Sequence, residues 1–566
     1  MPSPNALTPV VKEDPIRMTD APSVVRHWGN RIRFPRYSLL ATPLQWVATL
    51  VVAVAMLPMA YLLWRARETI GSDHIDFLLT ANTLRIIGNS ILLTAAVAIS
   101  ASIISIPLAW LTTHSDLPGR QIWLVLGLLP LAIPSYLGAV TLTLALGPRG
   151  LLQGWLEPLG VSRLPEIYGF SGAWLSLTLF TFPYVLLPVR AAFLNMDPAM
   201  EEMARSLGSN RWRIFWRITF PLLRPSLAVG MLLTSLYTLS DFGAVSVMQF
   251  TTFTRAIYVQ YGLPFFGRAS AAFLSLILMA LALSLFLLER RISSRLQHFR
   301  DISGARRPSK TVQLGRWKYA ALTFCTFIIS LSVLIPIVVL ISWLGRHKPA
   351  YALPLDLPTL TQNTLGVAAL TACLAAIATL PVAYLVIRSP SQWNRVLYRL
   401  AFLPNALPGI VIALSLIFFS TRHLLSIYQT LPLLLLGYGI RFMPLSLGST
   451  RNALASVNLR YEEAARGLGA IPLRALWRIT LPLARSGILA GMALIFLNVV
   501  KELPTTLLLS PTGFQTYATY IWNSYDEAIF SQIALPGLIL IALCALSLIP
   551  VFAWDRLLRK GNGHSL

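Results

Sequence analysis

The stretch EEMARSLGSNRWRIFWRITFPLLRP, residues 201–225, returns later in the chain as EEAARGLGAIPLRALWRITLPLARS, residues 462–486. Both copies are charged and aromatic, whereas the sequence around them is apolar. Eight residues of the first copy recur 261 positions later: Glu202, Gly208, Trp216, Arg217, Ile218, Thr219, Pro221 and Arg224 return as Glu463, Gly469, Trp477, Arg478, Ile479, Thr480, Pro482 and Arg485. Chance does not keep register over so many positions, so the chain is an internal duplication.

The composition is that of a membrane protein. Hydrophobic residues make up 55% of the chain and charged residues only 12%, about half the charge of a soluble domain. The apolar runs are continuous and do not alternate, which predicts membrane-spanning helices and argues against a barrel of strands. Twelve spans are predicted, at residues 45–64, 86–112, 121–146, 172–192, 226–247, 269–288, 319–343, 364–387, 400–420, 432–452, 486–506 and 532–554.

The distribution of basic residues sets the orientation. The net charge is +24, and the run 290–318 alone holds nine Lys and Arg residues. Lys and Arg are concentrated in loops that stay in the cytoplasm and face anionic lipid, so this charge indicates lipid and not nucleic acid. The expected organisation is a cytoplasmic N-terminal segment (1–44), a first half (45–289), a basic cytoplasmic linker (290–318), a second half (319–555) and a cytoplasmic tail (556–566).

The duplication extends beyond the repeated stretch. At an offset of 274, Asn89, Pro107, Pro130 and Pro134 match Asn363, Pro381, Pro404 and Pro408. The change of offset places 13 extra residues in the first half, which fit the loop at 147–170. Six spans in each half is an even number, so both halves face the same way, and a parallel repeat of this kind puts a pathway between the halves.

Each copy of the repeated stretch reads as two short helices. Acidic residues favour the start of the first helix and a glycine ends it; the second helix mixes aromatic and basic residues, and Pro221 is expected to stop it. One copy alone could be an amphipathic hairpin on the membrane surface. Two copies at equivalent points of two halves favour a pair of docking elements for a two-fold partner.

The stretch resembles the coupling loop of ABC importer permeases of the type I fold, whose pattern is Glu-Ala-Ala, three residues, Gly, nine residues and Ile-x-Leu-Pro. The second copy matches in full with Glu463, Ala464, Ala465, Gly469, Ile479, Leu481 and Pro482. The first copy has Glu202, Ala204, Gly208, Ile218 and Pro221 but departs at Met203 and Phe220. The resemblance covers roughly residues 40 to 555 and implies an all-α membrane protein of about 12 helices in two halves, in a bacterial inner membrane with both termini cytoplasmic. In that family the loop inserts into a groove on a cytoplasmic ATPase subunit.

Fusion of two halves in one chain resembles the ferric iron and thiamine branch of the family. Residues 240–261 and 501–522 both resemble segments of ferric iron permeases, which implies ferric iron as cargo. Thiamine, whose ring could lie against Tyr237, Phe242 and Tyr258, polyamines and phosphonates remain alternatives.

Three ionisable residues fall within apolar sequence. Asp241 and Glu502 are counterparts at the offset of 261 and each lies about 24 Å along a helix from its coupling loop, while Arg441 replaces Phe180. Ionisable groups at such depth often mark pathways. Alternatively, each acid lies at the extracytoplasmic mouth, where it is solvated or caps a helix that breaks at Gly243 or Pro504. Arg441 could pair with Glu502 across the pathway, pair within its own half or snorkel.

The sequence lacks the motifs of an ATPase or of another enzyme. No Gly-x-x-x-x-Gly-Lys-Ser/Thr loop is present to hold ATP, and neither a catalytic triad nor a metal cluster is evident. The chain is therefore expected to be no enzyme and to hold no cofactor. The resemblance implies that two ATPase subunits bind the ATP and that an extracytoplasmic binding protein delivers the cargo. An ion-coupled secondary transporter is the alternative of a different class; it would show ionisable residues within several helices, where this chain has few, and the coupling motifs have no role in it. A membrane enzyme or scaffold is a further alternative.

Overall fold

The computed structural model describes residues 38–69, 80–148, 150–160, 163–263, 267–300, 311–345 and 356–561. Expectations for the N-terminal segment up to residue 37, for linker residues 301–310 and for the last five residues lie outside these ranges. Within them the chain is helical, and the only β-pairing is an isolated bridge between Ser115 and Val312. The fold class is the all-α membrane fold that the sequence predicts.

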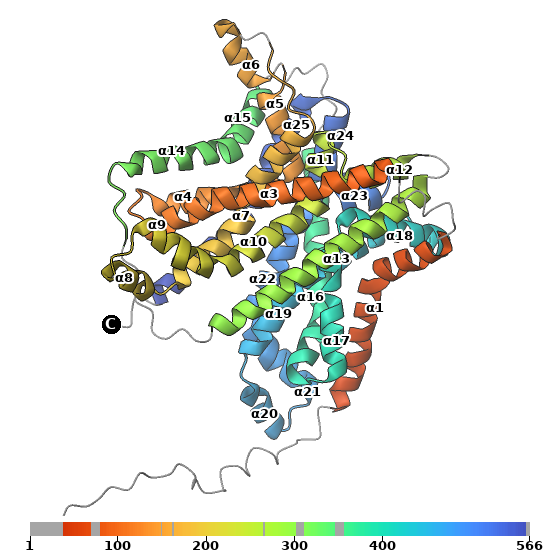
Figure 1. Ribbon diagram of the computed structural model, residues 1–566. Helices are drawn as coiled ribbons and strands as arrows, with labels where there is room; N and C mark the ends of the chain where they lie inside the picture. The colour runs from red at the N-terminus through yellow and green to blue at the C-terminus, as the bar shows by residue number, and fades with distance from the viewer. Residues whose placement is uncertain are drawn as a thin grey trace, which may run out of the picture.

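Figure 1 shows the helices of the two halves. Those of the first half are α1 (Ser38–Thr69), α3 (Ala81–His114), α4 (Arg120–Leu128), η1 (Leu129–Ala132), α5 (Ser135–Leu146), α6 (Leu151–Leu156), η2 (Glu157–Leu159), α7 (Phe170–Asn195), α8 (Pro198–Ser206), α9 (Arg211–Ile214), η3 (Phe215–Thr219), α10 (Phe220–Ser240), α11 (Gly243–Val247), α12 (Phe253–Gly262) and α13 (Gly267–Arg300). Those of the second half are α14 (Trp317–Ile329), η4 (Ser330–Leu334), α15 (Ile335–Leu344), α16 (Leu357–Arg388), α17 (Gln392–Ala401), η6 (Leu403–Ala406), α18 (Gly409–His423), η7 (Leu425–Ile427), α19 (Leu431–Ser456), α20 (Leu459–Gly467), α21 (Pro472–Ala475), η8 (Leu476–Thr480), α22 (Leu481–Val500), α23 (Pro504–Leu509), α24 (Tyr517–Asp526) and α25 (Phe530–Gly561).

The predicted spans coincide with long apolar helices. In the described ranges nine helices are long and apolar enough to cross a membrane, or up to 11 if two bent pairs each count as one span. The apolar part of α25, Phe530–Leu546, matches the twelfth predicted segment. The two bent pairs correct the predicted spans 121–146 and 400–420, because each turns by 100° or 104°. Both turns lie just before a repeated proline, Pro134 or Pro408, which begins the second arm.

Polar contacts of the two halves repeat the sequence duplication. Asn89 donates its side-chain amide to the Thr251 carbonyl at 3.0 Å, and its counterpart Asn363 donates to the Gln515 carbonyl at the same distance. The next residue of each pair, Ser90 or Thr364, accepts a hydrogen bond from the backbone at the start of α12 or α24. The two halves are therefore built on one plan down to single hydrogen bonds.

The first helix of each half packs against the other half. Ala48, Val52 and Ala55 of α1 lie in a buried cluster with residues of α16, α17 and α19. Cys325 and Ile328 of α14 lie in a cluster with residues of α3 and α7. Figure 1 shows the same exchange, with α1 beside α16 and α17 and with α14 on the side of α3 and α4. Because the first helix of each half packs against the other half, the two halves are held together by this exchange.

The end of the linker also docks on the first half. The Val312 N–H donates to the His114 carbonyl at 2.7 Å, and the Leu314 N–H donates to the Asp116 carboxylate at 2.9 Å. Lys318 lies 3.8 Å from the same carboxylate. The described part of the linker is thus held against the end of α3.

Candidate functional site

We call the two copies of the repeated stretch the first (201–225) and the second (462–486) coupling segment. Each opens in a short capped helix, α8 or α20. The Asp197 carboxylate accepts the Ala199 N–H at 3.0 Å at the start of α8, and the Asn458 side chain accepts the Arg460 N–H at 3.0 Å at the start of α20. These bonds satisfy backbone donors that a helix start leaves free. The acidic residue in the first turn, Glu201 or Glu462, also lies where the helix dipole favours negative charge.

Each of these helices ends in a turn that requires a glycine. Gly208 has φ +77° and Gly469 has φ +88°. The N–H of the following residue, Ser209 or Ala470, donates back five residues at 3.0 Å, as in the Schellman motif. The left-handed backbone is accessible to glycine at little cost. The two glycines, which are equivalent in the two copies, therefore form the turns at the tips of the coupling segments.

The second part of each segment runs straight into a membrane span. α9 continues through the π-helical turn η3 into α10, and α21 continues through η8 into α22. The prediction that Pro221 stops this helix was wrong. A proline has no N–H, and Pro221 and Pro482 lie in the first turn after a π-turn, where the helix has already altered its hydrogen-bond register. The predicted spans 226–247 and 486–506 are corrected accordingly: the helices run from Trp212 to Ser240 and from Pro472 to Val500.

The residues predicted for coupling lie on the tips and bases of these segments. Those that are exposed are Glu202, Gly208, Glu463, Ala464, Gly469 and Pro482, and those that are half-buried are Ala204, Ile218, Pro221, Ala465, Ile479 and Leu481. The leucine that precedes each tip glycine is exposed to solvent: Leu207 is 79% exposed and Leu468 is 90% exposed. Apolar side chains exposed at matching positions of the two halves are the kind of surface that often marks a protein–protein contact.

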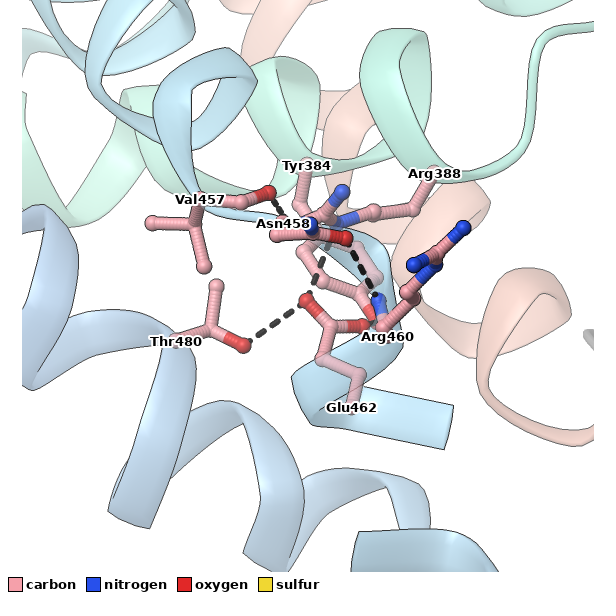
Figure 2. A network of polar contacts seen from close by, with 7 residues as sticks. All are labelled: Tyr384, Arg388, Val457, Asn458, Arg460, Glu462 and Thr480. Carbon is pink, nitrogen blue, oxygen red and sulfur yellow. Dashed lines mark hydrogen bonds and ion pairs between the residues drawn. The ribbon is translucent and has the colours of Figure 1, made fainter. Parts of the chain in front are cut away.

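The acid that holds the second segment is Glu462, which sequence reasoning did not single out. Its carboxylate accepts hydrogen bonds from Arg388 Nε at 2.9 Å and from Thr480 Oγ1 at 2.7 Å, and Tyr384 Oη lies 3.5 Å away (Figure 2). Arg388 also donates to the Val457 carbonyl at 3.0 Å. The recurrence of this acid in the two copies could have identified Glu462 from the sequence. Arg388 could not be identified in this way, because the equivalent residue of the first half is His114.

The first segment keeps only part of this network. Thr219 Oγ1 donates to Glu201 at 2.8 Å, which matches the bond between Thr480 and Glu462. Arg205 lies 3.5 Å from Glu201 but comes from the same helix and is 48% exposed. Each coupling helix is thus fastened to the base of the following span through a threonine.

A cavity of about 140 Å³ lies between the halves. Its lining includes five pairs of equivalent residues: Tyr237 and Asn498, Ser240 and Lys501, Asp241 and Glu502, Phe242 and Leu503, and Gly243 and Pro504. Equivalent residues meet at one place only near the axis that relates the halves. The cavity therefore lies on the pseudo-two-fold axis, where a parallel repeat places a pathway.

The three predicted pathway residues all line this cavity. Asp241 accepts the Ala244 N–H at 2.8 Å and a hydrogen bond from the Ser135 hydroxyl. Glu502 accepts the Thr505 hydroxyl at 2.7 Å and its N–H at 3.3 Å. Both acids thus cap the short helix that follows, as the alternative interpretation held, and they do so in the cavity wall.

Of the alternatives left open for Arg441, the structure shows a pair with Glu502 at 2.7 Å, and both residues belong to the second half. Gly409 and Ser135, which sequence reasoning missed, occupy equivalent positions in the two halves: serine binds Asp241, and glycine leaves room for Arg441. Lys501 reaches across the halves, with Nζ 3.3 Å from the Leu131 carbonyl. In the described part of the chain no group of three His, Cys, Asp or Glu residues could hold a metal ion.

Two segments of the chain, 101–298 and 377–562, match the model of one family, described as the binding-protein-dependent transport system inner membrane component. The matches fall once in each half and each contains one coupling segment. The duplication read from the sequence is therefore a duplication of this family's unit.

Three permeases are similar to this chain over different shares of its length. The Fe(3+)-transport system permease protein FbpB 2 of Haemophilus influenzae is 30% identical over 90% of this chain and 97% of its own length. The ferric transport system permease protein FbpB of Actinobacillus pleuropneumoniae is 24% identical over 83% of this chain and 71% of its own length. The sulfate transport system permease protein CysW of Synechocystis is 28% identical over 36% of this chain and 76% of its own length.

Proposed function

The chain belongs to the binding-protein-dependent transport system inner membrane components, and from this premise we propose that its cargo is ferric iron. As a member it is a multi-pass inner membrane permease of an ABC importer, with both permease halves fused in one polypeptide. A partner ATPase supplies the energy in this family and a binding protein supplies the cargo.

One observation carries the assignment of the cargo. The two ferric iron permeases match more than four fifths of this chain, so the likeness spans both halves and the linker between them. The sulfate permease and the molybdenum permease ModB of Escherichia coli match only about a third of it, at 36% and 34%. The fused architecture is thus shared with the ferric iron permeases.

The cavity between the halves supports a route for a cation. Asp241 and Glu502 offer carboxylate oxygens, the kind of ligand that hard cations prefer. Each carboxylate is already satisfied by a helix start, and Glu502 is also neutralised by Arg441. Acids held in this way bind a passing ion weakly, which suits a route on which the binding protein holds the metal tightly and the permease must release it. Asp241, Glu502 and Arg441 are therefore proposed to line the pathway or its gate.

The coupling segments support a particular assembly. Two equivalent bared tips call for two ATPase subunits, one on each tip, with the termini on the same cytoplasmic side and the binding protein on the opposite face. Closure of the ATPase dimer on ATP would draw the tips together and open the halves outward, and hydrolysis would reset them. In this proposal ATP is bound by the partners and this chain holds no cofactor.

The deciding experiment compares uptake of labelled ferric iron in cells with and without this gene, with labelled thiamine measured beside it. Loss of ferric iron uptake with unchanged thiamine uptake is expected. Thiamine is the informative control because Tyr237 and Phe242, the aromatic walls considered for its ring, do line the cavity. The reverse result would overturn the iron assignment and leave the importer in place.

A further inference from the structure

A buried ion pair joins the second coupling helix to a membrane span. Arg388 and Glu462 lie 2.9 Å apart and each side chain is only 5% exposed. Charges removed from water persist only when their remaining hydrogen-bonding groups are satisfied. Here Thr480 donates a hydrogen bond to Glu462 and the Val457 carbonyl accepts one from Arg388, so each charged group has a further hydrogen-bond partner (Figure 2). We call this contact between Arg388 and Glu462 the joint.

The joint connects three elements at one carboxylate. Arg388 is the last residue of α16, Glu462 lies in α20, and Thr480 ends the π-turn at the base of α22. α16 packs along α19 and α22, the inner spans of the second half. A movement of α20 is therefore passed directly to α16 as well as to α22.

The first half lacks the same joint. The residue equivalent to Arg388 is His114, the last residue of α3. Its ring packs against Phe193 with centroids 5.3 Å apart, and its Nδ1 lies 2.8 Å from Thr113 Oγ1. Within the described residues His114 and Glu201 interact electrostatically but form no ion pair, and the hydrogen bond of Glu201 is to Thr219 at the base of α10.

We propose that the two coupling helices transmit the movement of the ATPases unequally, with the second half taking the larger share through Arg388. This inference rests on the proposed coupling function. Arg388 is a positioning residue in this scheme: it holds Glu462, and through it α20, to the end of α16. The first coupling helix, α8, has no buried ion pair to α3: it is held by the hydrogen bond from Thr219 and by the weaker electrostatic interaction of Glu201 with His114, and it follows its ATPase more loosely.

Hydrogen exchange can test the joint without knowledge of the cargo. α8 and α20 are matched elements of nine residues each, and their backbone amides would be followed by mass spectrometry in the full permease in lipid nanodiscs. We expect the protection factors of α20 to exceed those of α8 by about tenfold, since a buried charge pair must open before α20 does. Arg388→His should lower the protection of α20 to that of α8, and His114→Arg, its mirror variant, should raise that of α8. Equal protection in the wild type, or unchanged α20 in Arg388→His, would overturn the proposal.

The consequence for coupling needs the whole transporter. In proteoliposomes that contain the permease, its ATPase and its binding protein, Arg388→His should lower the cargo moved per ATP hydrolysed several-fold while the ATPase still copurifies and hydrolyses ATP. Glu462→Gln should do the same, and Glu201→Gln should have a smaller effect. Equal losses for the two acids would contradict unequal transmission. Unchanged exchange of α19 amides identifies variants that still fold, and a wild type that moves no ferric iron counts against the cargo and leaves the exchange result standing.

Discussion

The guanidinium of Arg441 occupies the space that a side chain at Gly409 would fill. A Cβ built on Gly409 would lie 1.4 Å from Arg441 Nη1 and 2.7 Å from Glu502 Oε1. Gly409 has no positive φ, so space and not backbone freedom explains the glycine. In the first half the same position holds Ser135, whose hydroxyl reaches Asp241 directly. A serine in one half and a glycine with an arginine in the other are thus two ways to satisfy equivalent acids.

Gly409→Ala should therefore break the pair between Arg441 and Glu502. A buried pair that loses one partner costs about 3 kcal/mol or more, so the melting temperature of the purified permease should fall and transport should fail. Gly439→Ala is the matched control in the same half, because nothing lies within 4 Å of its Cβ position. Melting of the two alanine variants at the same temperature would show that Arg441 can move aside freely.

Substitution at the tips of the coupling segments should uncouple transport without unfolding the permease. Gly208→Ala or Gly469→Ala forces a left-handed backbone on a residue with a Cβ, at a cost of about 1 kcal/mol, which shifts the tip away from its docking position. Gly467→Ala lies two residues from Gly469 and has neither a positive φ nor a close neighbour, so it should transport normally. The measurement is cargo moved per ATP hydrolysed. A Gly469→Ala variant that couples as well as Gly467→Ala would show that the tip tolerates another conformation.

Cysteines at the two acids should report the opening of the cavity. Asp241 and Glu502 line one cavity of about 140 Å³, so Asp241→Cys with Glu502→Cys should cross-link in one nucleotide state and not in the other if the cavity is a gate. Ser240→Cys with Lys501→Cys gives a second equivalent pair that leaves both helix caps intact. The three native cysteines, Cys325, Cys373 and Cys544, would first be replaced by alanine. Equal cross-linking with and without trapped nucleotide would leave the acids with a capping role alone.

The duplication made much of this fold predictable. Repeated residues in register, such as Pro134 with Pro408 and Gly208 with Gly469, identified equivalent elements, and continuous apolar runs identified the spans. The direction of the chain at Pro134 did not follow from hydropathy, because an apolar run reads the same whether the helix continues or turns by 100°. Pro221 misled for a related reason: a proline reads as a stop, yet a π-turn before it lets the helix pass.

The site was predictable where the halves agree and hidden where they differ. Asp241 and Glu502 stood out because an acid recurs at one offset in apolar sequence. Arg388 and Gly409 depend on contacts with residues 74 and 32 positions away, Glu462 and Arg441, and their counterparts in the first half are of other types. A search for repeated residues misses such positions, because the two halves have different side chains at equivalent places.

The bared leucines of the coupling tips should contribute directly to binding the ATPase. Leu207 and Leu468 are 79% and 90% exposed, and burial of a leucine side chain contributes about 2 kcal/mol. Leu468→Ala should then weaken the binding of the ATPase by about thirtyfold, and Leu207→Ala should act in the same direction. Because neither side chain packs within the permease, its melting temperature should not change. Binding would be measured by titrating the purified ATPase onto the permease in nanodiscs.

Leu425 provides the control for this titration. It is 70% exposed in η7 between α18 and α19, at the far end of α19 from the second coupling segment. Leu425→Ala removes the same apolar surface from a place that the ATPase does not reach, so its affinity should equal that of the wild type. If all three leucine variants bound the ATPase as the wild type does, the leucines at the tips would lie outside the contact, and the docking surface would have to be formed by other residues of the coupling segments.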